Sequence, residues 1–359
     1  MALLFAEGFD PYGSLANMQA SRWGAVGAEQ TAPVPTLVAA AGPFGTQALQ
    51  MPGAYNTAGF LRTNQIAGLS LSNTLCIGFW RKCTIGGSFG YSGTISRDGG
   101  LVLPNSSNGF ATLIGDNASG LITIYNPANQ TALVTTGKAI NDGNWHYIEA
   151  SFVFSATSGS FQLYVDGVVV ANASGLQTWV SGVTLLGTIG FGAYGATNSG
   201  NTYTVQYDDV QVWDNTGSTF NTFPRGPKRI TTLNPAGAGS STQFTPSSGS
   251  NYSIAAQAWG ASGTLTDTGT GHTDLYTTGG VSYSPGMVDG VLVTALASNP
   301  AGDGAHSLTP KIQTQSIQSG ASSVLTATAT EVSTLFTADA TGAALTAATI
   351  NSMQIGFGD

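Results

Sequence analysis

Charged side chains are scarce in this sequence: Asp, Glu, Lys and Arg make up 8% of 359 residues, about a third of the usual share. Cysteine occurs at two positions and histidine at three. Two cysteines exclude a fold held together by a disulfide framework. No apolar run reaches the length of a transmembrane helix, so we expect no membrane-spanning segment. A surface with so little charge is weakly protected against association, which favours a subunit packed into an assembly.

The two cysteines, Cys76 and Cys83, are seven positions apart in LCIGFWRKC, a segment that predicts a strand. Side chains alternate between the two faces of a strand, so an odd spacing places the two thiols on opposite faces. We therefore expect two buried or half-buried thiols that do not bond to each other.

The charge that is present is mostly negative, with a net charge of −8 and a pI near 4.6. This balance argues against nucleic-acid binding, because neutralising phosphates needs clustered Lys and Arg. The basic cluster in the chain is Arg225, Lys228 and Arg229 in RGPKR, which we expect to be a domain junction held by a few salt bridges. The opening MALLFAEGFDPYG lacks the basic start of a signal peptide, so we expect synthesis in a cytoplasm.

Glycine is abundant, with 49 residues, and short apolar runs are separated by Gly, Asn and Ser. This punctuation and the lack of long helical patterns predict an all-β protein. The expected strands are 3–9, 58–66, 74–84, 121–125, 132–136, 145–154, 161–165, 168–171 and 202–213, followed by 290–295, 307–317, 323–328 and 352–357.

The clearest strand pattern lies between Asn144 and Ala171. His146, Ile148, Ala150 and Phe152 alternate with polar or smaller residues, which is the period of a half-buried strand. The run FQLYV predicts a second strand that pairs with the first. Asp166-Gly167 then predicts a tight turn, and VVV predicts a third strand that pairs with the second.

The proline- and glycine-rich segment 215–230 marks a boundary between two domains. We expect the first domain to span residues 1–222 and the second, smaller β-sandwich to span 223–359.

Four segments of the first domain, TLCIGFWRKCT, DGNWHYIEASF, LYVDGVVV and YDDVQVWDN, resemble laminin-G-like, concanavalin A-like domains and appear in the order of that family. The resemblance implies a jelly-roll sandwich that binds sugars or proteins more often than it catalyses a reaction. It also gives the expected core, which is Phe79, Trp80, Trp145, Phe152, Leu163, Val165, Val210 and Val212.

Two segments of the second domain, Arg229–Tyr252 and Thr341–Phe357, resemble a domain that recurs in virion proteins of tailed phages. In those proteins it follows a laminin-G-like domain. The resemblance implies a phage structural protein, made in the bacterial host cytoplasm and located in the virion.

Enzymatic residues are not evident, and we expect no catalytic activity. A sandwich glycosidase needs two carboxylates facing the substrate, but the four glutamates, Glu7, Glu29, Glu149 and Glu331, do not lie at strand spacing. Asp208 and Asp209 are adjacent, so we expect them on opposite faces of a strand. The histidines His146, His272 and His306 lack metal-ligand spacing.

Ligand-binding residues are weakly indicated. The residues considered for calcium are Asp98, Asp116 and Asp142, which we expect in loops with Asn117, Asn141 and Asn144 nearby. Turn formation explains such residues better than calcium binding does. The aromatic residues considered for glycan binding are Tyr91, Tyr125, Trp179, Tyr194 and Trp259, and none is assigned that role because aromatic residues in a sandwich more often form its core.

The function expected from the sequence is therefore a non-enzymatic virion structural protein, namely a capsid decoration or head-fibre subunit, since the chain lacks the long repeats and heptads of tail fibres. The alternative is a tail-associated adhesin that binds host glycans. The expected partners are the major capsid protein or tail proteins. We expect a homo-oligomer, with a trimer favoured, held by polar and apolar contacts that salt weakens little.

Overall fold

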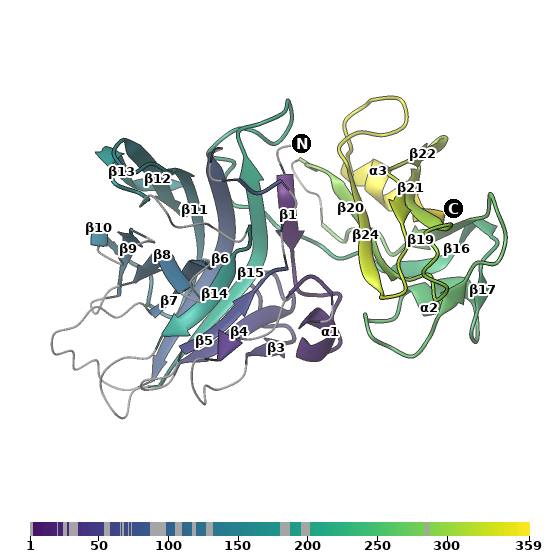
Figure 1. Cartoon of the computed structure of the whole chain (residues 1–359), viewed down its shortest axis with the longest axis horizontal. Coiled ribbons are helices and arrows are strands. Elements are labelled where there is room, and N and C mark those ends of the chain that lie inside the picture. Colours follow the sequence, from purple (N-terminus) through teal and green to yellow (C-terminus); the bar gives the residue numbers. More distant parts are fainter. Residues whose placement is uncertain are drawn as a thin grey trace. The chain divides into compact units, whose positions relative to one another are not determined.

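The computed structural model describes residues 3–19, 21–23, 27–28, 35–53, 58–64, 66, 68–70, 72, 74–86, 98–104, 110–116, 120–126, 132–179, 187–194, 202–283 and 287–359. The chain divides into two compact units (Figure 1). The first contains Met1–Asp10 and Ser14–Ile230, and the second contains Pro11–Gly13 and Thr231–Asp359. The division after Ile230, rather than after residue 222, arises because residues 223–230 pack on the first unit.

The first unit is a sandwich of two antiparallel sheets. Its larger sheet has eight strands in the order β13-β12-β11-β6-β15-β4-β3, with β1 also paired to β15. Their bounds are β1 (Leu3–Glu7), β3 (Thr36–Val38), β4 (Ala48–Gly53), β6 (Leu75–Gly86), β11 (Trp145–Val153), β12 (Gly159–Val165), β13 (Val168–Leu176) and β15 (Thr202–Asp214).

The facing sheet of the first unit has seven strands in the order β10-β9-β8-β7-β14-β5-β2. Their bounds are β2 (Gly27–Ala28), β5 (Ala58–Arg62), β7 (Asp98–Pro104), β8 (Phe110–Asp116), β9 (Leu121–Tyr125), β10 (Ala132–Ala139) and β14 (Gly190–Tyr194). A short helix, α1 (Leu15–Gln19), follows β1.

The hairpins predicted between Asn144 and Ala171 are present as β11, β12 and β13. Residues Asp166 and Gly167 both have positive φ, 53° and 78°, as a two-residue turn between right-twisted strands requires. Val165 and Val168 therefore face each other across the hairpin. This part of the sequence prediction is confirmed.

The core lies between the two sheets and contains most of the residues predicted for it. Phe79, Phe152, Leu163, Val165, Val210 and Val212 are buried. Trp80 and Trp145 are only half-buried, so their assignment to the core was wrong. Trp80 lies on the outer face of β6, where its indole Nε1–H donates to the carbonyl of Lys228 at 2.8 Å. Both cysteines are buried and form no disulfide with each other, as predicted.

One ion pair is buried in this core. Arg81 of β6 donates from Nη2 to Asp116 of β8 at 2.8 Å, and the two side chains are 1% and 0% exposed. Arg81 also donates to the carbonyl of Ile140 and the side chain of Asn141, each at 3.1 Å. Because β6 and β8 belong to different sheets, this pair joins the two layers of the sandwich.

The second unit is a smaller β-sandwich. A six-stranded sheet has the order β16-β19-β25-β21-β22, with β23 paired to β21, and two-stranded sheets are formed by β20 with β24 and β17 with β18. The bounds are β16 (Pro235–Thr242), β17 (Thr245–Pro246), β18 (Leu265–Thr266), β19 (Thr273–Thr278), β20 (Val291–Ala297), β21 (Ser307–Gln313), β22 (Ile317–Ser319), β23 (Ser323–Val324), β24 (Thr330–Phe336) and β25 (Gln354–Gly358), with helices α2 (Asn251–Ala255) and α3 (Ala347–Ser352).

The core of the second unit is small, and a buried carboxylate supplements it. Val293 of β20 and Phe336 of β24 pack against Ile312 of β21, which places the two-stranded ribbon on the larger sheet. Asp274 is fully buried and accepts hydrogen bonds from the backbone of Gln243 and Phe244, from Asn251 and from Tyr276. No helix among the described residues of either unit is long and apolar enough to cross a membrane.

The Arg81–Asp116 pair generates a prediction about stability. Replacing Arg81→Met leaves Asp116 buried without its cation, and this should cost about 3–5 kcal/mol. Urea unfolding followed by tryptophan fluorescence measures the loss, since Trp259 is the one tryptophan outside the first unit. The matched control is Lys138→Met, which removes a cation that is 38% exposed and 3.7 Å from Asp166 and should cost less than about 1 kcal/mol. Equal losses in the two variants would contradict the assignment.

Candidate functional site

Small polar side chains cover the outer face of four neighbouring strands of the larger sheet. Ser151 of β11 pairs with Cys76 of β6 on one side and with Gln162 of β12 on the other, and Gln162 pairs with Asn172 of β13. A second row runs parallel to the first, two residues along each strand. The two rows are Cys76–Ser151–Gln162–Asn172 and Val153–Ser160–Ser174. Adjacent strands lie about 4.8 Å apart, so each row presents a side chain at that interval.

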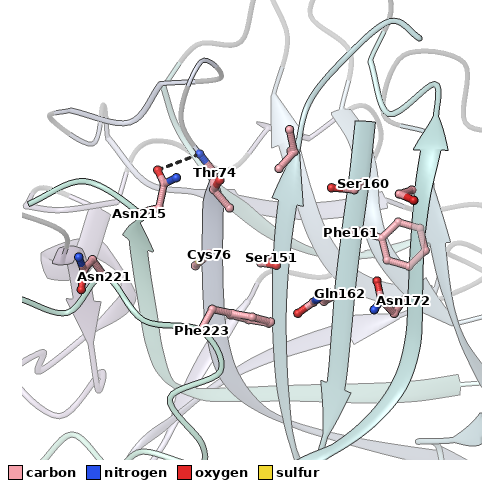
Figure 2. Close-up of a pocket in the computed structure, with 12 residues that line it drawn as sticks. Thr74, Cys76, Ser151, Ser160, Phe161, Gln162, Asn172, Asn215, Asn221 and Phe223 are labelled. Carbon is pink, nitrogen blue, oxygen red and sulfur yellow. Dashed lines mark hydrogen bonds between the residues drawn. The ribbon is translucent and has the colours of Figure 1, made fainter. Parts of the chain in front are cut away.

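The segment that follows β15 turns this flat face into a groove. Asn215 accepts a hydrogen bond from the backbone of Thr74 at 3.4 Å, and Asn221 and Phe223 lie along the same side of the floor (Figure 2). The Phe223 ring is held between Trp213 at 6.3 Å and Tyr164 at 5.5 Å. The groove encloses about 410 Å³, a volume within the range of small-ligand sites.

The wall of the groove is fixed by a carboxylate on the sheet. Glu149 of β11 is 1% exposed and accepts hydrogen bonds from the backbone N–H groups of Arg225 at 2.5 Å and Gly226 at 3.0 Å. Burial raises the pKa of Glu149, while these two N–H groups and the charges of Arg225 and Lys228 oppose that rise. Glu149 thus ties the segment after Phe223 to the middle of the sheet.

The two arginines of the basic cluster RGPKR contact aromatic rings. The Arg225 guanidinium lies over Phe220 at 4.5 Å and over Trp213 at 5.5 Å, and that of Arg229 lies over Phe44 at 4.9 Å. These are cation–π contacts within the first unit. The segment is therefore part of the outer face of the sandwich, where aromatic rings contact both of its arginines.

Asp208 and Asp209 do not alternate as their adjacency predicts. A bulge in β15 lies between Asp208 and Gln211, and Asp209 has a φ of 50°. Asp208 accepts from Thr46 at 2.5 Å, and Asp209 accepts from the backbone of Ile230 at 2.9 Å. Burial, together with Asp10 and Glu7, raises the pKa of Asp208 to about 7. Burial and the charge of Asp208 raise the pKa of Asp209.

The described glutamates have structural contacts. Glu7 accepts from the backbone of Phe9 at 2.8 Å and contacts Trp23 Nε1 at 3.3 Å, while Glu331 accepts from Thr294 at 3.1 Å. Glu29 lies outside the described residues. None of these contacts places two glutamates on the groove.

The calcium candidates are in different surroundings. Asp116 lies at the end of a strand rather than in a loop, and its partner Arg81 supplies the positive charge that a cation would bring. Asp98 pairs with Asp116 across β7 and β8, but its side chain and Asn117 are outside the described residues. Asp142 is 45% exposed and lies 3.0 Å from His146 Nε2. Among the described side chains, no group of three His, Cys, Asp or Glu could hold a metal ion.

The side chains of His146 and His272 each contact a carboxylate, and His306 forms a backbone hydrogen bond. His146 is buried between Asp142 and Asp166, with Nδ1 at 2.7 Å from Asp166. His272 lies 2.8 Å from Asp267 in the second unit, and the backbone carbonyl of His306 accepts from Leu325.

The aromatic residues considered for glycan binding do not line the groove. Tyr125 is fully buried, Trp179 packs on Phe154, and Trp259 packs on Tyr12 in the second unit. Tyr91 and the side chain of Tyr194 lie outside the described residues. Phe223, which lines the groove together with Phe161, was missed because it lies in a segment that the sequence marks as a boundary.

A family model described as the concanavalin A-like lectin/glucanases superfamily, of the laminin-G type, matches residues 56–219. The first unit has a concanavalin A-like fold. The match includes the strands that form the groove floor and ends before Asn221 and Phe223. No curated protein matches the sequence.

Several solved structures are similar to this chain at low identity. Botulinum neurotoxin type C, whose cell entry depends on two ganglioside molecules, is 12% identical, with 52% of this chain and 43% of that chain covered and a TM-score of 0.35. The chain thus spans less than half the length of that toxin chain. Lectin I-B4 from Griffonia simplicifolia is 12% identical over 59% of this chain and 99% of its own, with a TM-score of 0.35. Arcelin-5 from Phaseolus vulgaris is 12% identical over 58% and 96%, with a TM-score of 0.36.

The Asp208–Asp209 pair generates a prediction about pH. Because the pKa of Asp208 rises on folding from its ordinary value of 3.8 to about 7, folding binds a proton between those values. The resulting stabilisation is complete below pH 3.8 and is lost as the pH rises through about 7. Asp208→Asn imitates the protonated acid and cannot titrate. Between pH 5 and pH 8, the free energy of unfolding, measured with urea, should therefore fall by about 1–3 kcal/mol less in this variant than in the wild type. Asp303→Asn, at an exposed position of the second unit, should leave the loss unchanged. An identical pH dependence in wild type and Asp208→Asn would refute the assignment.

Proposed function

We propose that this chain is a non-enzymatic binding protein whose first unit holds glycans in the outer-face groove. The observation that carries the proposal is that the hydroxyl and amide side chains of Ser151, Ser160, Gln162, Asn172 and Ser174 line one groove with the ring of Phe223. Hydroxyl and amide groups both donate and accept hydrogen bonds, as sugar hydroxyls require. An aromatic ring at the border offers an apolar surface to the C–H face of a pyranose.

The location that we propose for the protein, a phage particle, is based on the sequence. The resemblance of Arg229–Tyr252 and Thr341–Phe357 to phage virion proteins supports a location on a phage particle. There the groove fits a tail-associated adhesin that binds host-surface glycans. The low charge of the chain supports a homo-oligomer, with a trimer favoured.

A capsid decoration or head-fibre subunit is the second candidate, and the second unit carries an observation in its favour. Ile317 of β22 and Val324 of β23 are 46% and 63% exposed, and both strands pair with β21. Ile317 lies opposite Gln313 and Val324 opposite Ser307, at the two ends of β21, and exposed apolar side chains along one sheet edge suit attachment to another protein.

The number of copies on purified particles separates the two roles. Quantitative mass spectrometry should give a small multiple of three or six for a tail adhesin and hundreds for a capsid decoration. Particles that lack the chain would exclude both roles while leaving the glycan proposal to its own test.

Glycan binding is tested with a printed glycan array, followed by calorimetry with the glycan that is retained best. Phe223→Ala should weaken binding roughly tenfold, equivalent to about 1.4 kcal/mol. Asn172→Ala leaves the Phe223 wall intact and should weaken binding by about 0.5–1.5 kcal/mol through a lost hydrogen bond. Phe44→Ala is the matched control, since Phe44 is 40% exposed and outside the groove. An array with no retained glycan, or equal losses in Phe44→Ala and Phe223→Ala, would end the proposal.

A further inference from the structure

The groove is lined entirely by uncharged residues, although carboxylates lie close to it. The lining residues are Thr74, Cys76, Ser151, Val153, Ser160, Phe161, Gln162, Asn172, Ser174, Asn215, Asn221 and Phe223. No Lys or Arg is among them, so the lining offers no cation with which an acidic ligand could pair.

The nearest carboxylates flank the β6 side of the groove. Asp214 pairs with Leu75, between the lining residues Thr74 and Cys76, and precedes the lining residue Asn215. Asp214 is 4% exposed and accepts from the backbone and hydroxyl of Thr216. Because paired residues share a face, Asp214 lies on the core side of the sheet with Leu75, and its charge acts on the groove from beneath the floor.

Glu149 contributes from the strand that carries Ser151, two residues away and on the same face. Burial first, and then the charges of Glu149 and Asp214, raise the pKa of the Cys76 thiol to about 12. The nearby guanidinium of Arg225 is directed over Phe220 and Trp213 instead of into the groove.

We propose that the groove selects uncharged glycans and rejects glycans that carry a carboxylate, sulfate or phosphate group. An anion entering this site would lose water and meet no Lys or Arg in the lining. Arg225 and Lys228 lie near Glu149, but the charges that act on Cys76 in the floor are those of Glu149 and Asp214. These effects are unfavourable to an anion, whereas a neutral sugar loses less hydration free energy and has no net charge for the carboxylates to repel. The inference rests on the proposed function and specifies its substrate class.

Binding to matched glycan pairs provides the first test. Lactose and 3′-sialyllactose share a core and differ by one carboxylate-bearing sugar, and the same comparison applies to any retained glycan and its sulfated form. At low salt the neutral member should bind at least roughly tenfold more tightly. Asp214→Asn keeps the acceptor for Thr216 and removes the charge, so it should reduce the difference in affinity between the neutral and the acidic glycan. The control Asp303→Asn should leave that difference unchanged. Equal or tighter binding of the acidic member would overturn the proposal.

A thiol placed in the groove reads the electrostatic potential without any glycan. Ser151→Cys, in a chain that also carries Cys76→Ala and Cys83→Ala, puts a single thiol in the middle of the first row. This thiol is allowed to react with a cationic reagent, trimethylammonium methanethiosulfonate, and with an anionic one, the sulfonate methanethiosulfonate. The ratio of the cationic rate to the anionic rate should be roughly tenfold higher than the same ratio for 2-mercaptoethanol, which serves as the reference thiol in free solution. Molar salt should reduce the excess.

The two tests separate failure of the selectivity from failure of the proposed function. A cationic excess at the thiol without any retained glycan would reject glycan binding and leave the negative potential established. Retained glycans with no cationic excess would reject the electrostatic basis of the selectivity and leave glycan binding in place.

Discussion

The carboxylate of Glu149 is the contact on which the candidate site depends. It sits in the middle of a sheet face, where water would otherwise solvate it, and it accepts the backbone N–H groups of Arg225 and Gly226. A buried carboxylate is stable only with such donors. The bonds hold the chain after β15 against the sheet, so Phe223 is positioned between Trp213 and Tyr164 and a flat surface gains a wall.

Much of the fold could be predicted because its signals are local. The alternation in β11 and the Asp166-Gly167 turn each depend on a few consecutive residues, and both are present. The burial of β11 shows where local reasoning stops. Tyr147 and Glu149 face outward by periodicity but are buried, because the segment 223–230 covers that part of the sheet. The core covers the inner face of β11, and a segment more than seventy residues away in the sequence covers part of its outer face.

The candidate site could be predicted only in part, for the same reason. Its floor consists of residues on predicted strands, but their register across four strands is a long-range property. Phe223 gave no signal, since proline and glycine around it indicate a linker. The bulge at Asp209 was also hidden, because a non-glycine residue with positive φ leaves no reliable mark in the sequence. Both errors concern chain segments that tertiary contacts place.

Scarce charge has a structural explanation in the described parts of the chain. Many of the ionisable side chains are buried and bind backbone or one another, among them Glu7, Arg81, Asp116, Glu149, Asp208, Asp209, Asp214 and Asp274. These charged side chains do not contribute to the surface, and their hydrogen bonds hold loops and strands in place. In the groove, the groups that can contact a ligand include hydroxyl, amide and aromatic groups but no charged side chain, and hydrogen bonds from such groups are directional but little affected by salt. A groove made from them therefore distinguishes ligands by the placement of their polar groups, while the carboxylates held beneath it determine which charges may enter.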